Sequence, residues 1–204
     1  MIKPVSPLFY LVLLSIFPLI ANSQNELLDE RDGKRYNIAA LGDLYWMTED
    51  LRYDQEQSIC MDNCDSIRFY HFNSLASVCP EGWRLPSMDE WNLFTESFKG
   101  VEKVRMMEEN KKLYRVDFLN QFNLFKENKL NIKPLGRIEG SKLDTGPFID
   151  YWTTNDVTDE RFHMHFTPYS IVGHAHKHHL KENKPEELRL FPIRCVCEVS
   201  SFKN

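Results

Sequence analysis

The chain has 204 residues, of which 42% are hydrophobic and 13% aromatic, and it carries a formal net charge of -5. This composition is typical of a globular protein, and the length suits one domain with a full hydrophobic core. The sequence lacks the concentrated positive footprint that phosphate binding requires, so we do not expect nucleic acid as a partner.

The first 23 residues have the organisation of a secretory signal peptide. Lys3 precedes an apolar run over residues 8–20, and small residues stand just before the expected cut. A transmembrane anchor is the alternative, but the run is too short to span a bilayer comfortably and Pro18 interrupts it. No cysteine stands where a lipoprotein would be cleaved. We therefore expect residues 1–23 to be removed and residues 24–204 to form one domain that is secreted or held at the cell surface, without a membrane span.

The next segments predict a β-hairpin, a loop and a helix in that order. Within residues 33–53, polar and apolar side chains alternate from Arg35 to Leu41, Gly42-Asp43 is a turn signal, and the strand-forming run "LYWM" follows, which is typical of a hairpin. Residues 54–68 are polar and predict a loop, and residues 69–79 predict a short strand that runs into a helix. Ser87 and Glu90 have the spacing of a capping box. The helix that follows repeats aromatic residues at helical spacing, which favours their burial: Trp91, Phe94 and Phe98.

The second half of the chain predicts helices followed by strands. Residues 101–131 are rich in Lys, Glu, Asn, Leu and Phe, which favours one or two further helices. Residues 133–148 contain several glycines and prolines and predict a long loop with turns. The segments 151–157, 161–169 and 188–199 favour strands. Strands at both ends with helices between them predict an α+β domain whose termini meet.

Four motifs give the chain a resemblance to a known family. They are Asp32-Gly33-Lys34 with "WMTEDLRY" (46–53), "CPEGWRLPSMDEW" (79–91), "KPLGRIEGSKLDTGPFIDYWTTND" (133–156) and "IRCV" (193–196). Together they resemble the Fibrobacter succinogenes major paralogous domain, a family of exported bacterial proteins with a C-type-lectin-like fold. Asp50 stands where the family usually has asparagine, the segment between 98 and 133 is longer than the family pattern, and the histidine-rich stretch 163–188 has no counterpart in it.

The resemblance implies a fold and a disulfide. The fold would be α+β and C-type-lectin-like, with antiparallel strands and two or three helices. In that fold Cys79 would lie beside the C-terminal strand that carries Cys195, and a bond between them would close a long loop. The stretch 79–91 would then form a structural corner and not a catalytic site.

The other cysteines leave alternatives open. Five cysteines are an odd number, so at least one thiol is free or pairs between chains. The spacing of Cys60 and Cys64 fits a small local disulfide, two plain thiols or, less well, a zinc site that lacks its second pair. The pairing of Cys197 is not fixed by the sequence.

The resemblance favours a non-catalytic binding module that recognises an unknown glycan or protein. Calcium is not expected, because the sugar-binding tripeptides of calcium-dependent lectins are missing and the oxygens of Asp144, Asp150 and the following residues lack the usual order. Calcium-free contacts through a loop would use four residues, although burial of the two aromatic ones is the alternative: Tyr151, Trp152, Asn155 and Asp156.

Two further hypotheses involve metals. "GWRLPSMDEW" and "IRCV" also resemble formylglycine-generating enzymes, oxidases that bind copper through a cysteine pair, and Cys195 and Cys197 would share one strand face. A disulfide to Cys195 would rule this out. The other hypothesis is a zinc or copper site, because alternating histidines on strands face one way. Its candidates, which a solvated strand would also explain, are His163, His165, His174, His176 and His178.

Overall fold

The structure is a computed structural model that describes residues 26–60, 64–96, 101–108, 111–118, 123–126, 128–154, 161–176 and 189–202. The described strands form three sheets whose strand pairs are antiparallel. The first sheet has the order β1 (Glu26–Leu28), β2 (Arg35–Leu41), β3 (Leu44–Met47), β14 (Val196–Glu198). The second has the order β10 (Ile149–Thr153), β11 (Arg161–Phe166), β12 (Ser170–His176), β7 (Lys111–Phe118), β6 (Val101–Glu108). The third has the order β4 (Ser58–Ile59), β5 (Phe69–His71), β13 (Arg189–Phe191), β8 (Arg137–Glu139), β9 (Lys142–Asp144).

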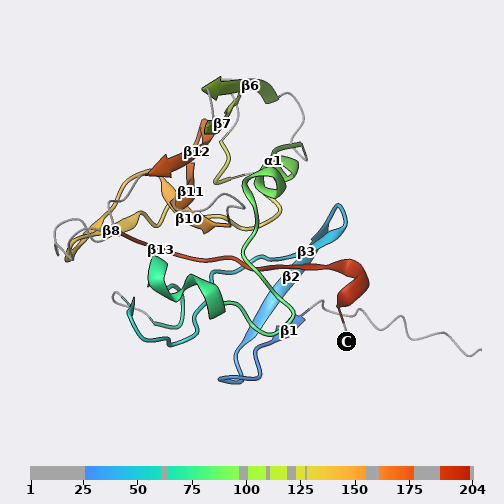
Figure 1. The fold of residues 1–204 in the computed structure, drawn as a ribbon, viewed down its shortest axis with the longest axis vertical. Coiled ribbons are helices and arrows are strands. Elements are labelled where there is room, and N and C mark those ends of the chain that lie inside the picture. The colour runs from blue at the N-terminus through green and yellow to red at the C-terminus, as the bar shows by residue number, and fades with distance from the viewer. Residues whose placement is uncertain are drawn as a thin grey trace, which may run out of the picture.

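The first sheet brings the two ends of the described chain together. Strands β2 and β3 form the predicted hairpin, and Gly42 has a φ of +62° in its two-residue turn, which a primed hairpin turn requires. The last strand, β14, pairs with β3, so strands from both ends of the chain lie in one sheet (Figure 1).

The architecture corrects the expected fold class. The structure consists mostly of antiparallel sheets that curl into half-barrels, whereas an α+β, C-type-lectin-like fold with two or three helices was expected. In the described part of the chain the helical segments are α1 (Met88–Glu96), which has nine residues, and the short 3-10 helices η1 (Phe72–Ser77) and η3 (Val199–Ser201). The prediction of a C-type-lectin-like fold is therefore wrong.

The largest local difference lies in residues 101–131, where helices were expected. Strands β6 and β7 pair over their whole length, from Val101 with Phe118 to Glu108 with Lys111. The segment 111–118 contains Val, Tyr and Phe, which favour strands. The lysines in this segment and the glutamates just before it are compatible with a strand as well as with a helix. The loop predicted over 133–148 contains a second hairpin, formed by β8 and β9.

Helix α1 begins as predicted and covers one face of the second sheet. The Ser87 backbone N–H donates to Glu90 Oε2 at 2.7 Å, and the Glu90 N–H donates to Ser87 Oγ at 3.2 Å, which completes the capping box. Trp91 and Phe94 are fully buried, whereas the third predicted core aromatic, Phe98, lies outside the described residues.

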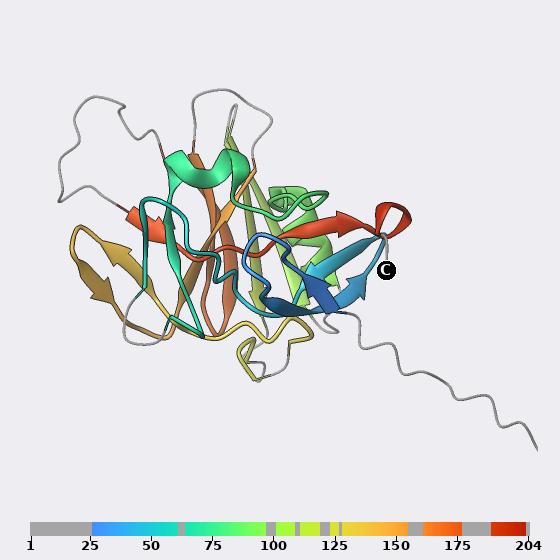
Figure 2. The ribbon, with the colours of Figure 1, turned by 90° about the horizontal axis from the view of Figure 1, so that it is seen from below.

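The main core lies between α1 and β10–β12. Its members include Trp91, Phe94, Tyr151, Phe162, Met164 and Phe166. Gly173 on β12 allows α1 to approach closely, because a Cβ at this position would lie 2.1 Å from Cε of Met88. In Figure 2 the hairpin of β8 and β9 lies on the other side of β11 and β12 from α1. The sheet is therefore packed against different elements on its two faces.

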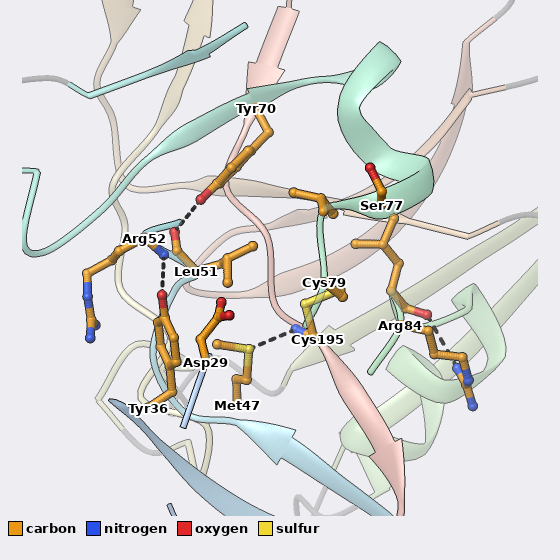
Figure 3. The surroundings of a disulfide bond; sticks show 12 residues. Asp29, Tyr36, Met47, Leu51, Arg52, Tyr70, Ser77, Cys79, Arg84 and Cys195 are labelled. Carbon is orange, nitrogen blue, oxygen red and sulfur yellow. Dashed lines mark hydrogen bonds between the residues drawn. A yellow bond between two sulfur atoms is a disulfide. The ribbon is translucent and has the colours of Figure 1, made fainter. Parts of the chain in front are cut away.

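A second core surrounds the bond between Cys79 and Cys195, which joins residues 116 positions apart in sequence (Figure 3). Arg84 and Val196 exchange two backbone hydrogen bonds, of 2.9 and 2.8 Å, just beyond the disulfide. Trp83 and Leu85 are buried on either side of Arg84. The stretch 79–91 thus ties the C-terminal segment to α1, which is the structural role expected for it.

Candidate functional site

The alternation of side chains on β11 creates the candidate site. Phe162, Met164 and Phe166 face the core under α1, so the intervening His163 and His165 face the other side of the sheet. On the neighbouring strand β10, Trp152 is the register partner of His163 and Asp150 is the partner of His165. The sheet therefore places two histidines and one aspartate side by side.

These residues form a polar cluster together with Arg137 from β8, and we call the four residues the Asp150 cluster. The Asp150 carboxylate is fully buried. Its Oδ1 lies 2.7 Å from His165 Nδ1 and 3.5 Å from His163 Nε2, and its Oδ2 accepts a hydrogen bond of 3.0 Å from Arg137 Nη1. A buried carboxylate is stable only with such partners, and here three cationic or protonatable groups supply them.

The charges in the cluster set the ionisation of Asp150. Burial acts to raise the pKa of Asp150, but the hydrogen bond from His165 and the charges of His163, His165 and Arg137 outweigh it, so the pKa lies below its ordinary value. The carboxylate is therefore ionised at neutral pH, and it can hold an imidazole by its Nδ1–H.

The cluster reaches the surface through Arg137 and His165, whose side chains are 23% and 24% exposed. Arg137 also lies 2.9 Å from Glu139 Oε1 and 3.4 Å from Asp144 Oδ2, so three carboxylates share one guanidinium. The guanidinium lies over the ring of Phe148, and that ring lies 5.5 Å from the His165 ring, measured between centroids. The result is a fixed, half-buried patch of charged and aromatic groups.

Of the five histidines predicted as metal ligands, four lie on strands that the structure describes. His163 is buried against Phe191, with ring centroids 4.7 Å apart, and strand β12 pairs with β11. In this register His174 is the partner of His163, and His176 is the partner of Arg161. His178 lies outside the described residues. Among the described side chains, no three His, Cys, Asp or Glu residues are grouped as a metal site.

Of the four residues expected to contact a ligand, the two that the structure describes are buried. Tyr151 is fully buried, stacks on Trp91 with centroids 5.5 Å apart, and donates a hydrogen bond of 2.7 Å to Asp50. Trp152 is 2% exposed and donates from Nε1 to the Tyr70 carbonyl at 2.7 Å. Asn155 and Asp156 lie outside the described residues. The two aromatic side chains thus serve the core.

Asp50 takes part in a second buried polar network. The Arg194 Nε lies 2.8 Å from Asp50 Oδ1, and both side chains are nearly inaccessible to solvent. The Arg194 guanidinium also donates to the backbone carbonyls of Met47, Leu130 and Asn131. Because its contacts come from four separate segments and are internal, this network stabilises the fold and does not present a site.

The cysteines bear out two disulfides and argue against the oxidase hypothesis. Cys60 is bonded to Cys64, and Cys79 is bonded to Cys195. Cys195 therefore cannot supply a thiolate to copper. Cys197 is the free cysteine; it is buried, and burial together with the negative charge of Glu198 raises the pKa of its thiol.

Sequence reasoning missed two members of the cluster. Asp150 was considered only as an oxygen ligand for calcium, and Arg137 was placed in a loop. The alternation of residues 149–153 could have placed Asp150 on a strand face, but nothing local indicates that β8 lies beside it.

The fold and the cluster together define a class: a β-rich protein cross-linked by two disulfides, with an ionic patch where its second and third sheets meet. Comparison of the chain with known protein families, with curated proteins and with solved structures finds no match in any of the three. In the described part of the chain, no helix is long and apolar enough to cross a membrane.

Proposed function

We propose that the protein is an exported, non-catalytic binding module, and that it recognises a glycan at the patch around Arg137. Two disulfides support export, because such bonds persist in oxidising compartments and are rare in the cytosol. The resemblance to an exported bacterial family points the same way.

The observation that carries the binding proposal is the arrangement around Arg137. Its guanidinium is held by Glu139, Asp144 and Asp150, and it lies over the ring of Phe148. Planar charged groups held in fixed positions can bind paired hydroxyl groups with two hydrogen bonds at once, and little entropy is lost when a ligand docks on a patch that is already ordered. Such an arrangement suits a ligand rich in hydroxyl groups.

A glycan array tests the proposal. The protein is produced by export, so that its disulfides form, and is applied to the array in EDTA, in calcium and in zinc. We expect saturable binding to a defined sugar. Asp144→Asn should weaken that binding about tenfold, which corresponds to the loss of one charged hydrogen bond. Asp144 is a suitable site for the substitution because its side chain is 45% exposed.

The matched control is Asp32→Asn. Asp32 also forms a surface ion pair, with Lys34 at 2.7 Å, but on the turn between β1 and β2 in the first sheet. This variant should bind as the wild type does. Absence of saturable sugar binding in all three conditions would contradict the glycan proposal, and equal losses in both variants would contradict the location of the site.

A further inference from the structure

We propose that the bond between Cys60 and Cys64 is a redox-active disulfide, which exchanges with an external thiol while the fold and the long-range disulfide stay intact. In this exchange the Arg68 guanidinium stabilises the Cys60 thiolate. The inference does not rest on glycan binding, because Cys60 follows β4 at one edge of the third sheet, whereas Arg137 lies on β8 near the other edge.

The two disulfides differ in how easily a thiol can reach them. Cys64 is exposed and Cys60 is partly exposed, whereas Cys195 is fully buried and Cys79 is only partly exposed. An attacking thiolate must contact one of the two sulfur atoms directly, so access controls the rate of exchange. The bond between Cys60 and Cys64 should therefore be attacked first, and at Cys64.

Opening this bond leaves the surrounding sheet in place. Cys60 and Cys64 are four positions apart and lie in the segment that joins β4 to β5. The register pairs of β4 with β5 and of β5 with β13 lie outside this segment. Reduction therefore changes the connection between two strands and leaves the third sheet paired.

Arg68 supplies a positive charge beside the sulfur that leaves. Cys60 and Arg68 are the next residues of the two chain segments beyond the pair Ile59–Phe69, so they leave β4 and β5 side by side. The Arg68 Nη1 donates to Ser58 Oγ at 2.9 Å. Ser58 is two positions from Cys60, and such positions share a face of an extended chain. The guanidinium thus lies on the side of β4 that carries the cysteine.

The guanidinium also has a donor that a thiolate can engage. The Arg68 side chain is 10% exposed, and its Nε is buried without a hydrogen-bond acceptor among the described residues. A buried donor that lacks an acceptor costs free energy, and a Cys60 thiolate would supply a negatively charged acceptor.

The acidic side chains of this region offset only part of the Arg68 charge. Arg68 Nη1 lies 2.8 Å from Asp54 Oδ1, but the Asp54 side chain is 75% exposed, so water screens the pair. Glu56 and Asp65 are exposed as well. Positive charge beside a cysteine favours its thiolate, and a sulfur that is stable as a thiolate leaves more readily.

The exchange balances with a thiol as its only co-reactant. A glutathione thiolate attacks Cys64 Sγ, a bond forms between these two sulfur atoms, the bond between Cys64 and Cys60 breaks, and the electron pair leaves on Cys60 Sγ. A second glutathione thiolate attacks the glutathione sulfur of this mixed disulfide and releases oxidised glutathione and the Cys64 thiolate. Two glutathione molecules are oxidised, one protein disulfide is reduced, and the protons of the two glutathione thiols pass to the two cysteines.

Disulfide mapping in glutathione tests the inference. The exported protein is incubated with reduced glutathione at neutral pH, its thiols are trapped with N-ethylmaleimide at successive times, and its peptides are analysed by mass spectrometry. We expect Cys60 and Cys64 to be labelled at least about tenfold faster than Cys79 and Cys195, with glutathione trapped on Cys64 at early times. Circular dichroism after labelling should show a folded protein.

Variants of Arg68 test the role of its charge. After selective reduction, Cys60 of Arg68→Gln should react with iodoacetamide about tenfold more slowly at neutral pH, because its thiolate fraction falls, and Arg68→Lys should restore most of the rate. The control is Arg35→Gln, since Arg35 lies on β2 with its side chain 63% exposed, and this variant should react as the wild type does. Melting temperatures show that each variant is folded.

Equal rates of labelling at the two disulfides would overturn the inference, and so would a bond between Cys60 and Cys64 that opens only when the protein unfolds. Wild-type reactivity of Cys60 in a folded Arg68→Gln variant would reject the contribution of the guanidinium.

Discussion

The two disulfides allow a quantitative test of what each contributes to stability. The bond between Cys79 and Cys195 spans 116 positions, whereas the bond between Cys60 and Cys64 spans four. In the chain-entropy model, closing the long loop lowers the entropy of the unfolded chain by an amount worth about 4–5 kcal/mol, and closing the short loop by about 2 kcal/mol. Removing the long-range bond should therefore cost about 2–3 kcal/mol more.

The test compares two double variants, Cys79→Ala/Cys195→Ala and Cys60→Ala/Cys64→Ala. Both are made in a Cys197→Ser background, because the free thiol could otherwise exchange with the remaining disulfide. Urea unfolding gives the free energy of unfolding from the midpoint and the slope. The burial of the bonds also favours a larger loss of stability when the long-range bond is removed, since Cys195 is fully buried and Cys64 is exposed.

A loss of the same size in both variants would refute this reasoning. It would mean that the unfolded chain already brings residues 79 and 195 together, or that the cost arises from local packing alone. A slope that differs between the variants would show directly that the compactness of the unfolded state has changed.

Three further changes have outcomes that the structure fixes. Gly136→Ala should lower the free energy of unfolding by at least about 2 kcal/mol and the melting temperature by about 4–8 °C, because Gly136 has a φ of +74° and a Cβ there would lie 2.1 Å from the Asp144 carbonyl oxygen. The control Gly33→Ala, at a φ of +75° with no atom within 4 Å, should cost only about 1 kcal/mol. Equal losses of stability in the two variants would contradict the close contact at Gly136. Ser87→Ala should lower the free energy of unfolding by about 1 kcal/mol through loss of the helix cap, and Ser87→Gly by less; unchanged urea midpoints would show that the cap is not needed. Because the pKa of Asp150 is lowered in the folded protein, the carboxylate stabilises the fold above its unfolded pKa of about 3.9, and this stability is lost as the pH falls through the folded value. The Asp150→Asn variant should therefore melt at a lower temperature than the wild type at neutral pH and lose less stability on acidification. Melting temperatures that fall in parallel with pH in the two proteins would contradict this.

The parts of the fold that could be predicted are those that depend on neighbouring residues. The β2–β3 hairpin follows from alternation around Gly42-Asp43, and the start of α1 follows from Ser87 and Glu90. Each of these signals lies within about ten residues. The hairpin of β6 and β7 was missed because residues 101–118 mix charged and apolar residues without a strict alternation, and that composition is compatible with helix and strand alike.

For the candidate site, too, the sequence predicts only what depends on neighbouring residues. The alternation in "RFHMHF" predicted that His163 and His165 share a face, and this local inference is confirmed by the strand β11. Asp150, whose carboxylate lies beside both imidazole rings, comes from another strand, and Arg137 comes from another sheet. Their association depends on how the sheets pack, and no pattern within 137–165 encodes it.

The sequence offered burial of Tyr151 and Trp152 as the alternative to ligand contact, and the structure bears out burial. Both aromatic residues are adjacent on one strand, so their side chains point to opposite faces. Both are nonetheless buried, because α1 covers one face of β10 and β13 lies against the other. An aromatic pair on a strand that is covered on both faces is indistinguishable, in sequence, from a pair exposed in a loop.

The bond between Cys79 and Cys195 also determines how the protein would respond to a pulling force applied at its two ends. Tension between strands β1 and β14 would pass along the chain to Cys79, cross the sulfur atoms, and leave through the last few residues. Residues 80–194, which lie between the two cysteines, would carry none of it. At about 3.5 Å per extended residue, roughly 400 Å of chain would stay locked until the bond is reduced. The second sheet and strands β13, β8 and β9 of the third, which hold the Asp150 cluster, would thus be shielded from mechanical extension, while the first sheet and strands β4 and β5 give way.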